Sequence, residues 1–415
     1  MPLALSVSAT VMFAFLSVGD AREPALWPQW RGPNRDGIVG GPAWPGTLKG
    51  KTLQPVWRVE VGEGYPGPVV AADRVFVAET KGGKEEVVRA LDRETGKQLW
   101  EHSWEGAMSV PFFARSNGSW IRATPAYDGE SLYVAGIRDV IVCLDAATGK
   151  ECWRADLRAR HATILPAFGF VCSPLIDGDA VYVQAASSFV KLDKKTGKTH
   201  WRALVEDADQ YGSAFSSPVV ATLAGKRQLV VQSRTVLAGV DPGDGKVLWK
   251  QPIPANKGMN ILTPTVYKES VFTSAYGAKA YRYGISKDGD AFAVTNAWTL
   301  PVAAYMSSPV VVGKYAYLHR QNQRISCVDL EAGKVAWTTE KTFGKYWSMV
   351  AQGDKILALD QRGTLYLLKA NPEKFELIDE IAVSKQETWG HLAVAGDMLF
   401  VRELKAVSAI RWMND

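Results

Sequence analysis

The residue types that most often catalyse reactions or hold metals are sparse in this chain of 415 residues. No two of its five histidines stand at the spacing of a zinc site, and none of its four cysteines is adjacent to another. No GxSxG, HExxH or phosphate-binding loop pattern occurs. We therefore expect no metal site and assign no catalytic residue.

A second set of side chains could bind a ligand. Short Ser-Pro-like segments that begin apolar strands recur along the chain, and aromatic, basic or sulfur-containing residues stand just before them or close by. These candidates are Tyr65, Trp120, Arg122, Phe215, Met306, Tyr346, Trp347, Trp389 and His391. If these segments converge, the rings would line a pocket for a flat ligand or a peptide strand, and Arg122 or His391 could bind a carboxylate. The alternative is that the loops only pack on one another.

A repeated sequence pattern predicts the β-hairpins that must hold these loops in place. Residues 90–100 read ALDRETGKQLW, and the pattern returns four times downstream. Each copy predicts a β-hairpin, because the Asp side chain can accept hydrogen bonds from turn N–H groups and the Gly supplies a positive φ. The flat Trp then suits burial between neighbouring sheets. The repeat residues, which we interpret as structural, are Asp92, Gly96, Trp100, Asp145, Gly149, Trp153, Asp193, Gly197, Trp201, Asp241, Gly245, Trp249, Asp329, Gly333 and Trp337.

Upstream of each copy lies a second hairpin, such as residues 172–183, CSPLIDGDAVYV. Two hairpins in series make a four-stranded antiparallel sheet. Outer strands are expected at Trp57, Trp100, Trp153, Trp201, Trp249, Trp298 and Trp337 and at residues 375–381, which gives eight sheets. The fifth loses the Thr-Gly-Lys of its turn, and the seventh replaces its turn with residues 371–374.

The two ends of the repeat region complete each other. Residues 55–61 form a lone alternating strand, while residues 389–412 supply three strands and no fourth. Pairing the first strand with the last sheet closes a ring and removes free edges. The sequence therefore predicts an all-β fold, an eight-bladed β-propeller of four-stranded blades, over residues 55–415.

The segments before the propeller suggest export. Residues 1–21 contain an apolar stretch and a small-x-small pattern, Gly19-Asp20-Ala21, typical of a signal peptide. Residues 22–54 form an irregular arm rich in Trp, Pro and Gly, whose tryptophans we expect to pack onto the body. We expect a periplasmic or extracellular monomer with no transmembrane segment in the mature chain. There is no cysteine near the cleavage point, so we do not expect a lipid anchor.

The net charge and the cysteine content say little about function. The net charge of +5 is spread along the chain without a basic block, so we expect no nucleic-acid binding. Cys143 and Cys152 flank one repeat hairpin and could form a disulfide in an exported protein, or remain two small buried thiols.

The repeat ALDxxTGKxxW, preceded by SPxxxGDxVYV, resembles the pyrroloquinoline-quinone (PQQ) type of propeller repeat over residues 55–412. That superfamily contains quinoprotein dehydrogenases and non-enzymatic relatives, including the propeller lipoprotein of the outer-membrane assembly machine, BamB. The arm WPQWRGPNRDG is similar to the start of exported members from planctomycete-type bacteria.

The resemblance implies two functions. A dehydrogenase of this type needs a cation held by carboxylate and amide oxygens, an Asp as general base, and commonly two adjacent cysteines. The expected mouth of this propeller offers no Asp or Glu, and only Asn260 as an amide. We therefore expect a non-catalytic scaffold that binds a protein or polymer of the cell envelope and needs no cofactor. One alternative is a PQQ-dependent alcohol or sugar dehydrogenase with Ca²⁺. Another, suggested only by the aromatic rim, is a polyol- or sugar-binding enzyme of unknown chemistry.

Overall fold

The computed structural model describes residues 26–112, 115, 118–207 and 212–413. The expected signal peptide, residues 1–21, and the first residues of the arm lie outside these ranges. In the described part of the chain, no helix is both long and apolar enough to cross a membrane.

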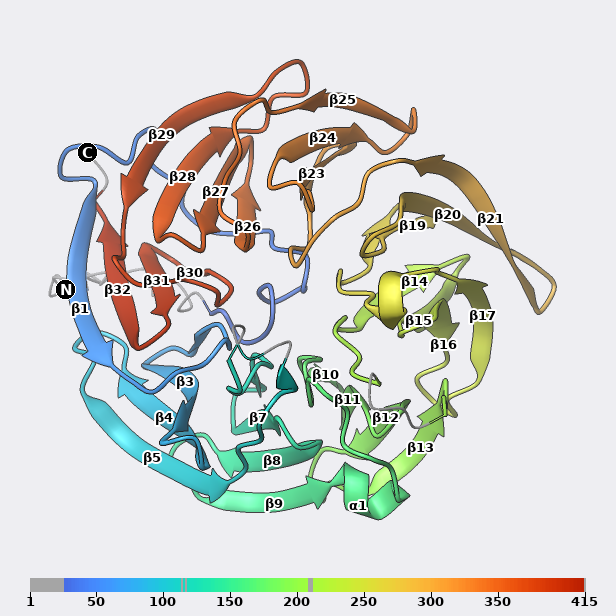
Figure 1. Cartoon of the computed structure of the whole chain (residues 1–415), viewed down its shortest axis with the longest axis horizontal. Helices are drawn as coiled ribbons and strands as arrows, with labels where there is room; N and C mark the ends of the chain where they lie inside the picture. Colours follow the sequence, from blue (N-terminus) through green and yellow to red (C-terminus); the bar gives the residue numbers. More distant parts are fainter. Residues whose placement is uncertain (1–25, 113–114, 116–117, 208–211, 414–415) are drawn as a thin grey trace, which may run out of the picture.

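Eight four-stranded antiparallel sheets surround a central axis as the blades of a propeller (Figure 1). Blade 1 comprises β2 (Val69–Val70), β3 (Arg74–Lys81), β4 (Glu85–Asp92) and β5 (Gln98–Glu105). Blade 2 comprises β6 (Ala126–Tyr127), β7 (Ser131–Gly136), β8 (Val140–Asp145) and β9 (Glu151–Asp156), followed by the short helix α1 (Leu157–His161). Blade 3 comprises β10 (Leu175–Asp177), β11 (Ala180–Ala185), β12 (Ser188–Asp193) and β13 (Thr199–Ala203). Blade 4 comprises β14 (Val219–Leu223), β15 (Lys226–Gln232), β16 (Val236–Val240) and β17 (Val247–Pro252), followed by the 3₁₀ turn η2 (Asn256–Gly258).

The second half of the chain repeats this plan. Blade 5 comprises β18 (Thr265–Tyr267), β19 (Ser270–Ser274), β20 (Ala280–Asp288) and β21 (Ala291–Leu300). Blade 6 comprises β22 (Val310–Val312), β23 (Tyr315–His319), β24 (Ile325–Asp329) and β25 (Lys334–Thr338). Blade 7 comprises β26 (Trp347–Gln352), β27 (Lys355–Asp360), β28 (Thr364–Lys369) and β29 (Glu376–Ala382). Blade 8 comprises β30 (Ala393–Ala395), β31 (Met398–Glu403), β32 (Ala406–Trp412) and the N-terminal strand β1 (Leu53–Glu60). The predicted eight-bladed architecture is confirmed.

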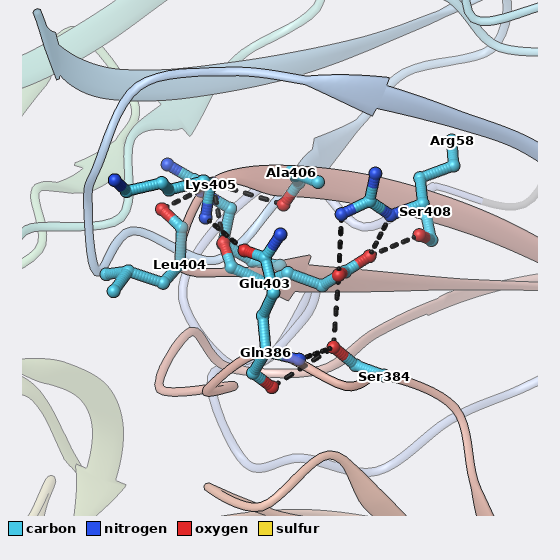
Figure 2. A network of polar contacts seen from close by, with 9 residues as sticks. Arg58, Ser384, Gln386, Glu403, Leu404, Lys405, Ala406 and Ser408 are labelled. Atoms are coloured by element: carbon cyan, nitrogen blue, oxygen red, sulfur yellow. Dashed lines mark hydrogen bonds and ion pairs between the residues drawn. The ribbon is translucent and has the colours of Figure 1, made fainter.

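Blade 8 joins the two ends of the chain. Strand β1 pairs antiparallel with β32, with Arg58 opposite Ser408. The Arg58 guanidinium donates two hydrogen bonds of 3.0 Å to the Glu403 carboxylate, which also accepts from the hydroxyls of Ser408 and Ser384 (Figure 2). Burial opposes ionisation of Glu403, but these hydrogen bonds outweigh it and hold its pKa below the ordinary value. A charged network therefore ties the first strand to the last blade.

The repeat tryptophans join neighbouring blades. Trp100 of blade 1 donates its indole N–H to the Ala146 carbonyl in the turn of blade 2, at 3.0 Å. Gly149 of that turn has a φ of +74°, and a Cβ built on it would lie 2.5 Å from Trp100 Cε3. Only glycine satisfies both the backbone conformation and the close approach of the ring. The same donation to the next blade is made by Trp57, Trp153, Trp201, Trp298 and Trp337.

Two blade junctions depart from this pattern. Blade 5 lacks the Thr-Gly-Lys turn, and Trp249 of blade 4 instead donates to Gln228 of its own blade at 2.6 Å. In blade 7 the position corresponding to the tryptophan is occupied by Asp379, which accepts hydrogen bonds from Thr47 and the Leu48 N–H and pairs with Lys49. The arm therefore covers the junction between blades 7 and 8, where β1 has no preceding turn to offer.

Candidate functional site

The loops that join one blade to the next converge on the axis and line a cavity there. Its non-protein space is about 1100 Å³ and is open to solvent. Blades 1 to 8 all contribute, because each inner strand begins beside the axis. The lining residues are Trp30, Tyr65, Arg122, Phe168, Val171, Ser173, Phe215, Ser217, Met259, Ile261, Met306, Ser307, Ser308, Tyr346, Trp347 and Trp389. We refer to this space as the axial cavity.

Stacked rings form one wall of the axial cavity. The Trp389 ring lies between Tyr65, at 4.5 Å between ring centroids and 16° between planes, and Tyr346, at 3.8 Å and 33°. The Arg122 guanidinium lies 5.3 Å from the Tyr65 ring centroid and 6.0 Å from that of Phe168. A cation so close to aromatic faces is stabilised by their quadrupoles. The wall therefore combines flat apolar surface with one positive charge.

Several polar groups of the axial cavity can only donate hydrogen bonds. Burial raises the pKa of both Tyr65 and Tyr346, so their hydroxyls stay neutral. Arg122 donates through Nη2 to the Gly118 carbonyl at 2.8 Å, while its buried Nε has no acceptor among the described residues. The buried indole N–H groups of Trp347 and Trp389 likewise have none. Of the described residues that line the cavity, none is an Asp or Glu that could balance Arg122. A ligand that supplies acceptor oxygens fits this set of groups best.

The arm forms the floor of the axial cavity. Trp27 pairs with Val70 of blade 1 through two backbone hydrogen bonds of 2.9 Å, and the chain then enters the middle of the ring (Figure 1). Trp30 lines the cavity and donates its indole N–H to Thr263 Oγ1 of the loop before blade 5 at 2.8 Å. Beyond it, residues 37–39 pair with Ala351 of blade 7. The arm therefore crosses the channel and closes the cavity from below.

Two buried arginines anchor the arm. Arg31 donates to the Pro309 carbonyl of blade 6, and Arg35 donates to the Pro174 carbonyl before blade 3 at 2.7 Å. Both side chains are almost completely buried, and desolvation lowers their pKa values to about 10. Both therefore remain charged at neutral pH, held by backbone carbonyls from opposite sides of the ring.

The structure brings together seven of the nine residues proposed from the sequence for this mouth. Tyr65, Arg122, Phe215, Met306, Tyr346, Trp347 and Trp389 line the axial cavity. Trp120 does not line it, and packs edge-on against Tyr65 with 5.3 Å between ring centroids.

His391 lies outside the axial cavity, covered by the arm. Its ring makes an edge contact of 4.9 Å with Trp30 and stacks at 6.3 Å on Trp27. Burial, together with the nearby Arg31 charge, lowers its pKa to about 3, so the ring is neutral. It is positioned to pack against the arm, and does not reach the cavity as a carboxylate-binding group.

Sequence reasoning missed Trp30 and Phe168 as lining residues. Trp30 was expected to pack onto the body, but no pattern in an irregular arm shows that it enters the channel. Phe168 precedes its Ser-Pro segment by more positions than the candidates considered, yet it packs on Phe215 at 5.7 Å between centroids. An aromatic residue in a long connecting loop was the only available signal.

The described lining of the axial cavity does not fit PQQ with Ca²⁺. Among the described residues that line the cavity there is no carboxylate and no side-chain amide, whereas Ca²⁺ takes oxygen ligands of those kinds. Asn260, the one amide considered from the sequence, uses its Nδ2 to hold the carbonyls of Ser233, Arg234 and Ile253. Among the described residues, no group of three His, Cys, Asp or Glu side chains could hold a metal. All four cysteines are free thiols, so the bridge considered between Cys143 and Cys152 is not formed.

Known proteins share this architecture. The family model for outer membrane protein assembly factor BamB matches residues 83–339. BamB of Moranella endobia is 22% identical over 347 residues, which cover 79% of this chain and 83% of that protein. BamB of Yersinia pestis is 24% identical over 276 residues, covering 60% and 63%. The crystal structure of BamB from Moraxella catarrhalis superposes with a TM-score of 0.63 at 16% identity, covering 88% of this chain and 98% of that one. This chain therefore belongs to the PQQ-like repeat propeller family of outer membrane protein assembly factor BamB.

Proposed function

We propose that this protein is a non-catalytic, exported scaffold of the cell envelope that binds another protein at the mouth of its axial cavity. This proposal rests mainly on the groups that line the cavity. The described lining offers aromatic rings, a cation and N–H donors, and it contains no carboxylate. Such a surface suits an apolar or aromatic anchor flanked by carbonyl or carboxylate oxygens, as an extended peptide supplies.

Two further observations support a protein partner. The named relatives are outer membrane protein assembly factors, so their names describe work on other proteins. The rim of the cavity also adds positive charge, since Lys345 lies 5.4 Å from the Tyr346 ring centroid and 5.9 Å from that of Tyr305. A partner segment with acidic side chains would therefore be favoured at this rim.

The test compares partner capture by matched variants. Mature protein is immobilised and exposed to envelope extract, with Trp389→Ala and Tyr346→Ala as the cavity variants. Tyr267→Ala serves as the control, because Tyr267 ends β18 and bonds to Glu331, away from the cavity lining. We expect a protein retained by the wild type and the control to be lost from both cavity variants. Equal retention by all four proteins would refute binding at the mouth.

The dehydrogenase alternative has its own test. Purified protein is titrated with PQQ and Ca²⁺ and followed by absorbance and by dye reduction with alcohols or sugars. We expect no saturable binding and no turnover, because the described lining of the cavity offers no oxygen ligands from carboxylates or amides. Stoichiometric quinone binding with dye reduction would overturn the scaffold proposal.

A further inference from the structure

The outer strand of blade 5 differs from the outer strands of the other blades. Strand β21 has ten residues, and no other strand among those described is as long. It pairs with β20 on one side and is the last strand of its sheet. In Figure 1 the β20–β21 hairpin projects outward from the ring. The outer edge of β21 therefore has no paired strand among the described residues, although β21 also contacts β17 of blade 4.

Strand β21 also lacks the charges that protect the other outer strands. It reads AFAVTNAWTL, without a charged residue or a proline. Each other outer strand carries at least one charged side chain, represented by Arg58, Glu101, Arg154, Arg202, Lys250, Lys334 and Glu380. Charged residues, prolines and short lengths are the usual means of preventing strand addition at an edge. Strand β21 has none of them.

The geometry of the hairpin keeps this edge regular. Residues 291–296 stay in unbroken register with β20, and the register shift comes only beside Trp298. Strand β19 ends its pairing at Gly284, so residues 285–288 and 291–294 continue as a two-stranded ribbon. Phe292 and Val294 are half-buried and pack toward the core, while the alternate positions Ala291, Ala293 and Thr295 are exposed. Small side chains leave the edge open to another strand.

We propose that β21 is a docking site for an extended, uncharged strand of another polypeptide, which adds to blade 5 as a fifth strand. Main-chain hydrogen bonds would supply the affinity, and alternate apolar side chains would continue the row of Phe292 and Val294. A second copy of this chain would offer its own β21 as the same kind of edge, so the test treats self-pairing as a separate outcome. This proposal is independent of the axial cavity.

The test uses a defined strand-forming probe. A fluorescent peptide of about ten alternating threonine and valine residues, with terminal lysines for solubility, is titrated with the full chain. Its control is the same peptide N-methylated at alternate residues, which removes the donors of one edge. We expect anisotropy to rise with the unmodified peptide only, and hydrogen exchange to slow at residues 291–296.

Matched variants locate the site. Ala293→Lys combined with Thr295→Lys places two charges at exposed positions of β21, and Leu99→Lys with Ser103→Lys does the same on β5. We expect the β21 pair to weaken binding at least about tenfold and the β5 pair to leave it unchanged, with circular dichroism confirming that both fold.

Three outcomes would overturn the proposal. These are no binding by the wild type, equal binding of the N-methylated peptide, and protection spread over the outer strands of other blades. Sedimentation of the wild type without peptide addresses self-pairing, since a dimer dissociated by the β21 pair would make a second copy the occupant.

Discussion

Replacing Gly149 with alanine tests how the blades are joined. Gly149 has a φ of +74°, a conformation that costs an alanine about 1–2 kcal/mol. The new Cβ would also lie 2.5 Å from Trp100 Cε3 and 2.6 Å from Cδ2, and over-packing of this kind costs about 1–3 kcal/mol. We therefore expect Gly149→Ala to lower the free energy of unfolding by about 2–5 kcal/mol.

Gly178→Ala is the matched control. Gly178 has a φ of +57° in the turn of blade 3, and an added Cβ would meet no atom within 4 Å. This variant should carry only the conformational cost of about 1–2 kcal/mol. The difference between the two variants, about 1–3 kcal/mol, then measures the contact between Trp100 and the turn of the next blade.

Urea unfolding followed by far-ultraviolet circular dichroism measures both variants without relying on tryptophan emission. A double variant, Gly149→Ala with Trp100→Leu, removes the ring that causes the clash. Its destabilisation should be less than the sum of the two single effects by about 1–3 kcal/mol. If the Gly149 and Gly178 variants lose equal stability and the double variant is additive, the tryptophan does not join the blades in the way described.

Three further predictions concern titration and thiols. Hydrogen bonding from Lys49 lowers the pKa of Asp379 to about 2, so its stabilising effect is present above about pH 4 and is lost as pH falls toward 2. Asp379→Asn should flatten the pH dependence of unfolding free energy in that window, and an unchanged slope would contradict the contact. Burial, with a smaller contribution from Arg31, lowers the pKa of His391 to about 3, so the unfolded state binds the extra proton and stability falls as pH drops from about 6.5. His391→Gln should remove that part of the fall in urea titrations between about pH 6 and 4. Cys152 is exposed and the other three cysteines are buried, so alkylation of native protein followed by mass spectrometry should label Cys152 first. If Cys143 and Cys152 both stay unlabelled after denaturation without reductant, the assignment of free thiols is wrong.

Much of the fold could be predicted because most blades contain a turn motif that can be recognised in a short stretch of sequence. The Asp92 carboxylate accepts from Thr95 N–H and its hydroxyl, and the same bonds recur at Asp145 and Asp193. These contacts span three residues, so a turn motif in the sequence reports them directly. The eight outer strands follow from counting such turns and the strands beside them.

The irregular positions could not be predicted in the same way. Asp379 occupies a tryptophan position, and only its contact with residues 47–49 of the arm explains a buried carboxylate there. Trp249 is a repeat tryptophan, yet it turns to Gln228 because the neighbouring blade lacks the receiving turn. The contacts of Asp379 reach across 331 residues to the arm, and the change at Trp249 depends on the next blade, so no local pattern at either position reports them.

The amino-acid sequence by itself determined the ring of eight blades and the placement of aromatic and basic residues on the loops at one mouth. Local turns and alternating strands encode those features, and their hydrogen bonds close within a few residues. Only the tertiary structure decided that the arm crosses the channel. It also placed Trp30 in the lining of the axial cavity and His391 outside it, packed against Trp30. These facts rest on contacts across more than 200 residues, such as Trp30 with Thr263, which appear only when the ring has closed.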